Sequence, residues 1–64
     1  MPKYRGRELR ENKGYTQEAL SRKAGVSRGT IIALEKNEQK ITTTKTLANI
    51  ASALDVSVDE LFFA

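Results

Sequence analysis

The chain has 64 residues, a net charge of +3 and neither cysteine nor histidine, which excludes disulfides, thiol or imidazole catalysis and the usual zinc ligands. We therefore expect one domain over residues 1–64 that is not an enzyme and has no catalytic residue, cofactor or metal. No apolar run approaches the roughly 18 residues of a membrane span, and no signal-peptide core is present, so we expect a cytoplasmic protein without a membrane partner.

Positive charge is concentrated in the first part of the chain. Residues 1–28 contain eight Lys or Arg against three Glu, a balance of +5, whereas residues 29–64 contain three Lys against five acidic residues, a balance of −2. This asymmetry favours a polyanionic partner such as a nucleic acid. A solvated charged surface is the alternative interpretation.

The first expected helix spans residues 4–13, YRGRELRENK. Leu9 provides its apolar position and Gly14 ends it. Gly6 lies inside this stretch and lowers its helix propensity, so the starting residue is the least certain part of the helix.

Two further helices are expected within Thr16–Asn37, TQEALSRKAGVSRGTIIALEKN. Thr16 is the expected N-cap of the first, and Leu20 and Ala24 are four residues apart, which places both side chains on one helical face. Gly25 ends this helix because glycine readily adopts the left-handed conformation found at helix C-termini.

Ser27 is the expected N-cap of the second of these helices, in which Ile31 and Leu34 form the buried side. Two short helices joined by a tight glycine turn make a helix-turn-helix. In such a motif the second helix can lie in the major groove of DNA.

The last part of the chain predicts one helix and one short helical turn. Thr43 is the expected N-cap of the helix, which carries its apolar residues at the i, i+3, i+4, i+7 spacing of a core face. Ser57 and Glu60 form a capping box that opens a last, fifth helix. The apolar residues of these two segments are Leu47, Ile50, Ala51 and Leu54, followed by Leu61, Phe62 and Phe63.

Four blocks of sequence, in order, resemble the phage Cro and repressor family, the XRE-type helix-turn-helix transcriptional regulators: ELRENKGYTQEALSRKAGVS, the pair Leu34-Glu35, TLANIASAL and VSVDELF. The resemblance implies an all-α, compact, five-helix, lambda-repressor-like DNA-binding domain with its helix-turn-helix at helices 2 and 3. It also implies a buried structural ion pair between Arg10 and Glu35. The alternative for Arg10 is a solvated arginine on an exposed helix face.

The outer side of the third helix is the candidate surface for reading DNA bases. An arginine at its start can donate hydrogen bonds to guanine O6 and guanine N7 at the same time, which makes Arg28 the leading candidate. An exposed Ile32 would gain from contact with a thymine methyl group, whereas Gly29 adds no side chain and would let the backbone approach the DNA closely. The candidate base-reading residues are Arg28, Gly29, Ile32, Ala33 and Lys36.

Phosphate contacts are expected around the starts of helices, where free amides and the helix dipole favour anions. The resemblance implies that Gln17 binds the DNA backbone. The loop at residues 36–41 departs from the family pattern because it is longer and contains Glu38, which puts its own phosphate contacts in doubt. The candidate phosphate-binding residues are Thr16, Gln17, Ser27, Asn37, Lys40 and Thr43.

The sequence therefore predicts a sequence-specific, double-stranded DNA-binding transcriptional regulator, a repressor that occupies a palindromic operator as a homodimer. The expected dimer seam is formed by Leu61, Phe62 and Phe63. One alternative is an antitoxin or restriction-modification controller of the same fold, which would also have a protein partner. Another is a protein-interaction module that has lost DNA binding, which Glu38, Gly29 and an exposed Ile32 would favour.

Overall fold

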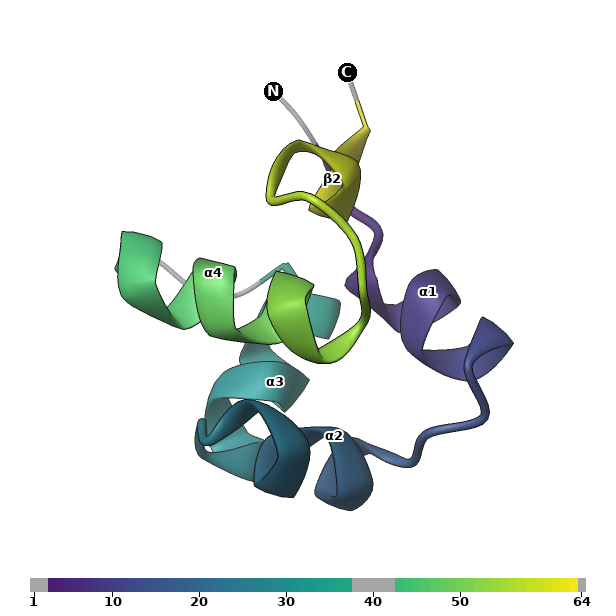
Figure 1. The fold of residues 1–64 in the computed structure, drawn as a ribbon, viewed down its shortest axis with the longest axis vertical. Helices are drawn as coiled ribbons and strands as arrows, with labels where there is room; N and C mark the ends of the chain where they lie inside the picture. The colour runs from purple at the N-terminus through teal and green to yellow at the C-terminus, as the bar shows by residue number, and fades with distance from the viewer. Residues whose placement is uncertain (1–2, 38–42, 64) are drawn as a thin grey trace.

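The computed structural model describes residues 3–37 and 43–63. In this part the chain forms four α-helices, one 3₁₀ turn and a two-stranded antiparallel sheet (Figure 1). The elements are β1 (Lys3–Tyr4), α1 (Gly6–Asn12), α2 (Gln17–Ala24), α3 (Arg28–Glu35), α4 (Thr44–Ala53), the 3₁₀ turn (Asp59–Leu61) and β2 (Phe62–Phe63).

The core lies between the helices, and α2 packs against both α3 and α4 (Figure 1). Each of these three helices contributes the apolar side chains that the sequence spacing predicted, because residues three and four apart share one helical face. The 3₁₀ turn closes the same core. The largest fully buried side chains are Leu20, Ile31, Ile50, Leu54 and Leu61.

The N-caps predicted for α2, α3 and α4 are confirmed. The side-chain oxygens of Thr16, Ser27 and Thr43 each accept a hydrogen bond from the amide three residues further on, at 3.0, 3.1 and 3.1 Å respectively. Gly25 ends α2 with a φ of 71°, in the left-handed region. The helix-turn-helix of α2 and α3 therefore lies where the sequence placed it.

The first helix begins later than predicted. Tyr4 was expected inside it, but α1 starts at Gly6 and Tyr4 lies in β1, paired with Phe62 of β2. The Tyr4 side chain is buried, and its ring meets the Phe62 ring edge-on with centroids 5.8 Å apart. Burial of this aromatic side chain against the end of the chain outweighs the local helical pattern.

The prediction of five helices is wrong for the described residues. The segment after Ser57 makes only one 3₁₀ turn, although the Ser57 hydroxyl does accept from the Glu60 amide at 3.3 Å. The chain then becomes extended at Phe62, with φ −128° and ψ 146°, and pairs with β1. A helix cannot continue through a residue that is held in a strand.

Leu61 cannot form the predicted dimer seam. Its side chain has no exposed surface and belongs to the core of its own chain. Phe62 is half-buried and packs on that core. The N–H groups of Tyr4 and Phe62 are also used, by the Asn37 side chain and the Asp59 carbonyl, so neither is free to pair with a strand of a second copy. The side chain of Phe63 lies outside the described part of the structure.

Gly6 is required by the packing of Tyr4 rather than by its own backbone. A methyl group at Gly6 would overlap the Tyr4 hydroxyl, whereas one at Gly29 in α3 would meet nothing within 4 Å. We expect Gly6→Ala to lower the free energy of unfolding by about 1–3 kcal/mol through overpacking. We expect the control Gly29→Ala, in the first turn of α3, to raise it by up to about 0.5–1 kcal/mol, because alanine loses less conformational freedom than glycine in a helix. Urea unfolding measures both, and equal gains would contradict the role of Tyr4.

Candidate nucleic-acid interface

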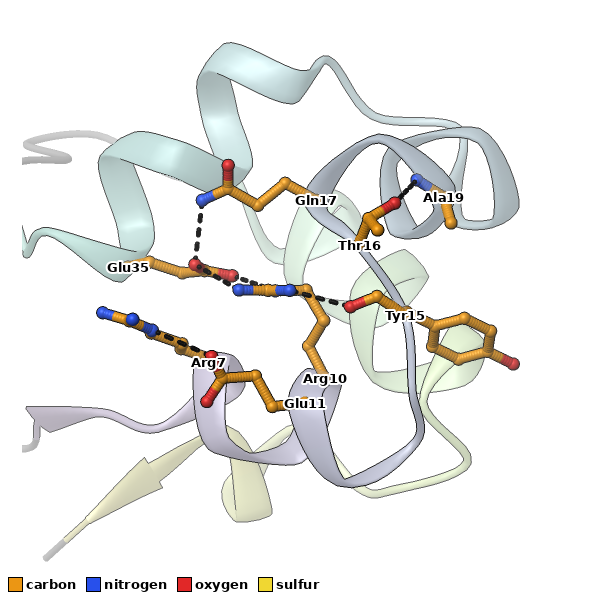
Figure 2. Close-up of polar contacts among 8 residues, drawn as sticks. All are labelled: Arg7, Arg10, Glu11, Tyr15, Thr16, Gln17, Ala19 and Glu35. Atoms are coloured by element: carbon orange, nitrogen blue, oxygen red, sulfur yellow. Dashed lines mark hydrogen bonds and ion pairs between the residues drawn. The ribbon is translucent and has the colours of Figure 1, made fainter.

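A buried ion pair joins α1 to the end of α3. Arg10 Nε donates to Glu35 Oε2 at 2.8 Å and Arg10 Nη2 donates to Glu35 Oε1 at 3.2 Å, so the contact is bidentate (Figure 2). The two side chains are only 10% and 4% exposed. The hydrogen bond to Glu35 raises the pKa of Arg10 above its ordinary value. The predicted buried pair is confirmed, and the alternative of a solvated Arg10 is excluded.

Two neighbouring segments join this pair. Arg10 Nη1 donates to the main-chain oxygen of Tyr15 at 2.7 Å, and Gln17 Nε2 donates to Glu35 Oε1 at 3.0 Å (Figure 2). One cluster of charge-assisted hydrogen bonds thus ties α1, the turn before α2, the first residue of α2 and the last residue of α3 together. A satisfied buried network of this kind fixes how α2 and α3 sit relative to each other.

The Gln17 side chain is therefore engaged within the protein. One of its two N–H groups is given to Glu35, and its carbonyl oxygen points away from that contact (Figure 2). The carboxylate of Glu35 can only accept, so the amide cannot be turned round without placing two acceptors together. Gln17 retains one N–H group for an external partner.

The predicted base-reading residues lie along the outer side of α3. Arg28, Gly29 and Lys36 are exposed, while Ile32 and Ala33 are half-buried. Arg28 forms no hydrogen bond or ion pair with any other residue that the structure describes, so its guanidinium is available to a ligand. Ile32 was expected to be exposed, whereas the structure shows its side chain half-buried.

Three of the predicted phosphate-binding residues already serve as helix caps. The hydroxyl of Ser27 also shares a hydrogen bond of 2.8 Å with that of Thr30, and the hydroxyl of Thr43 donates to that of Thr46 at 2.9 Å. These oxygens stabilise their helices whether or not DNA is bound. Lys40, the fifth candidate in chain order, lies outside the described residues together with Glu38.

Asn37 occupies the position directly after the last turn of α3. Its φ of 58° is in the left-handed region, which asparagine tolerates better than most residues. Its amide N–H donates to the Leu34 carbonyl at 3.0 Å, and its side-chain Oδ1 accepts from the Tyr4 amide at 3.4 Å. The sequence predicted Asn37 as a phosphate ligand but gave no sign of the contact with Tyr4, since β1 was not predicted.

A model of the helix-turn-helix family matches residues 7–61, which is most of the chain and includes all of α2, α3 and α4 and all of α1 except its first residue. The chain belongs to the XRE-type helix-turn-helix family of DNA-binding transcriptional regulators. The resemblance seen in the four sequence blocks is thereby confirmed. No curated protein sequence matches the chain at a significant level.

Several solved structures of family members are similar to this one. SinR in complex with DNA is 35% identical, with a TM-score of 0.83 over 89% of this chain and 90% of that one. SinR comes from Bacillus subtilis. The restriction-modification controller protein C.AhdI from Aeromonas hydrophila is 34% identical, with a TM-score of 0.82 over 91% of this chain and 86% of that one. In the complex of SinR with SinI, the matched region covers 89% of this chain but only 55% of the SinR chain, again at 35% identity and a TM-score of 0.83.

Among the described residues, no group of three or more Asp, Glu, Cys or His side chains is arranged to hold a metal ion. Within residues 3–37 and 43–63, no helix has both the length and the apolar character needed to cross a membrane. The exposed side of α3, together with the start of α2, forms the candidate nucleic-acid interface.

Proposed function

We propose that this helix-turn-helix domain acts in the cytoplasm as a sequence-specific repressor that occupies a palindromic operator as a homodimer. The observation that carries the proposal is the orientation of α2 and α3, held by the buried Arg10–Glu35 pair and the Gln17 hydrogen bond to it. It leaves on the outer side of α3 the exposed guanidinium of Arg28, which has no partner among the described residues. The similarity to SinR, which was solved in complex with DNA, supports DNA as the ligand.

In this proposal α3 lies in the major groove and Arg28 reads a guanine. Ile32 follows Arg28 by four residues and therefore faces the same way, about 6 Å further along the helix axis. At a rise of roughly 3.4 Å per base pair this is about two base pairs away, where Ile32 would contact a thymine methyl group. Gly29 and Ala33 are also four residues apart, and the missing side chain of Gly29 and the small one of Ala33 would let this side of α3 approach the bases closely.

Phosphates would be bound at both sides of the reading helix. The start of α2 offers the first-turn amides that its cap Thr16 does not use, and the remaining N–H group of Gln17. Ser27 is the corresponding cap at the start of α3. The proposed set also includes Asn37, Lys40 and Thr43, the cap of α4. Unlike base contacts, these contacts set register and affinity without sequence preference.

We propose a homodimer because of the length of DNA that one domain can contact. One α3 helix covers about half of a site, so two copies would dock on half-sites about 34 Å apart, one helical turn of DNA. With Leu61 buried and Phe62 packed on the core of its own chain, Phe63 is the residue on which we base the proposed seam. Phe63→Asp should then leave the monomer folded and weaken operator binding, and sedimentation showing an unchanged oligomer would place the seam elsewhere.

Two measurements test this function directly. Selection of bound sites from a random DNA pool should recover a palindrome containing guanine in each half. The logarithm of affinity should then fall steeply with the logarithm of salt concentration, because phosphate binding releases counterions. A protein-interaction module that has lost DNA binding would recover no consensus and show almost no salt slope.

A second candidate is a regulator that also answers to a protein partner. It is favoured by the similarity to C.AhdI, a restriction-modification controller, and to SinR as found in complex with SinI. Such a protein would bind DNA in the same way. The test for this second candidate is a protein partner that changes the affinity for the selected operator without competing for the outer side of α3.

A further inference from the structure

The Asn37 amide is oriented by β1. The Tyr4 main-chain N–H is a donor, so the side-chain oxygen of Asn37 must face it, and the observed contact at 3.4 Å has that arrangement. The NH₂ group is then turned away from β1. Asn37 is exposed, and neither of its two side-chain N–H groups meets an acceptor among the described residues. The protein thus presents a pair of fixed donors just beyond the end of the reading helix.

This orientation is opposite to that of Gln17 at the start of α2. Gln17 turns its NH₂ group inward to Glu35 and its oxygen outward (Figure 2). An outward oxygen repels a phosphate, and only one N–H group of Gln17 remains to offset it. Of the two amides, Asn37 is therefore the better prepared to bind an anion.

Positive charge accompanies the Asn37 donors. Lys3, Tyr4 and Asn37 line one surface hollow. The three carboxylates that also line it are each paired with an arginine: Glu8 with Arg5 at 3.9 Å, Glu11 with Arg7 at 3.4 Å and Glu35 with Arg10 at 2.8 Å.

Lys3 differs from these arginines, because it is exposed and has no ion pair among the described residues. Its carbonyl belongs to the same peptide unit as the Tyr4 N–H that holds Asn37. The uncompensated charge in this hollow is therefore a cation next to the oriented amide.

We propose that Asn37 and Lys3 form a phosphate-binding site for the DNA backbone, in which the Tyr4 amide positions the Asn37 side chain. The proposal rests on the proposed DNA-binding function and adds Lys3 to its interface. Asn37 donates hydrogen bonds to a phosphate oxygen, and Lys3 supplies charge without a fixed geometry. This site would bind the DNA backbone beyond the C-terminal end of α3.

Two Asn37 variants separate the donor from the backbone conformation. Asn37→Gly tolerates the left-handed φ but removes the amide. Asn37→Asp keeps an acceptor for Tyr4 and replaces the outward NH₂ by a carboxylate oxygen. We expect Asn37→Gly to weaken binding to a short random-sequence duplex roughly 10-fold or more, as for a lost hydrogen bond to a charged group, and Asn37→Asp to weaken it further. The matched charge control is Asn12→Asp at the exposed end of α1, which should change binding much less.

Lys3→Met should make the salt slope shallower by about one unit, whereas Lys13→Met, at another exposed lysine, should leave it unchanged. Urea unfolding must show that each variant is folded where binding is measured. The Asn37 side-chain NH₂ resonances should also shift on titration of the wild type with the duplex, which a purely structural role would not cause.

Wild-type affinity in both Asn37 variants, with a wild-type protein that does bind the duplex, would overturn this site and leave the proposed function intact. A wild-type protein with no affinity for the duplex at low salt would instead overturn the proposed function, and this site with it.

Discussion

Arg10→Met is expected to lower the free energy of unfolding by about 3–5 kcal/mol, which is a large fraction of the stability of so small a domain. The reason is the burial of Glu35, whose side chain is only 4% exposed. Without the guanidinium, this carboxylate would keep one neutral donor, Gln17, and the Tyr15 carbonyl would lose its partner. An unpaired buried charge costs far more than the net contribution of the intact pair.

The matched control for this variant lies on the same helix. Arg7 also pairs with a glutamate, Glu11, at 3.4 Å, but these side chains are 67% and 55% exposed. Arg7→Met should therefore change the free energy of unfolding by less than about 1 kcal/mol. Urea unfolding followed by circular dichroism measures both variants. Equal, small losses from Arg10→Met and Arg7→Met would show that the buried pair does not hold α1 to α3.

Much of the fold could be predicted because its signals are local. The caps at Thr16, Ser27 and Thr43 each depend on a bond to an amide three residues away, and the apolar spacing depends on one helix at a time. The two-stranded sheet could not be predicted in this way. Tyr4 pairs with Phe62 across nearly the whole chain, and a two-residue strand has no periodicity to detect.

The candidate interface shows the same division. The resemblance to the Cro and repressor family identified Arg10 and Glu35 as a pair, and the structure confirms them. It could not say which way the amides of Gln17 and Asn37 face, because that depends on whether the neighbour is an acceptor or a donor. Leu61 was misassigned to the dimer seam for a related reason, since an apolar residue near a chain end has the same sequence pattern in a core and at an interface.

Arg28→Ala is expected to weaken binding to the selected operator by about 1–3 kcal/mol, or roughly 5- to 150-fold, and to relax the preference at one base position in each half-site. Arg28 is exposed and has no partner among the described residues, so the variant should fold with a stability close to that of the wild type. Binding to random-sequence DNA should fall less, because a base contact contributes little there.

Arg28→Lys distinguishes a contact with a DNA base from a contact with a DNA phosphate. Lysine keeps the positive charge but lacks the planar guanidinium, which can donate to guanine O6 and guanine N7 at the same time. If Arg28 reads a guanine, Arg28→Lys should lose much of the base preference and keep the salt slope. If Arg28 instead binds only phosphate, Arg28→Lys should retain the operator affinity, and Arg28→Ala should lower operator and random-DNA binding alike with a slope shallower by about one unit. In that second case the candidates for base contacts would be Ile32, Ala33 and Lys36, the other predicted base-reading side chains.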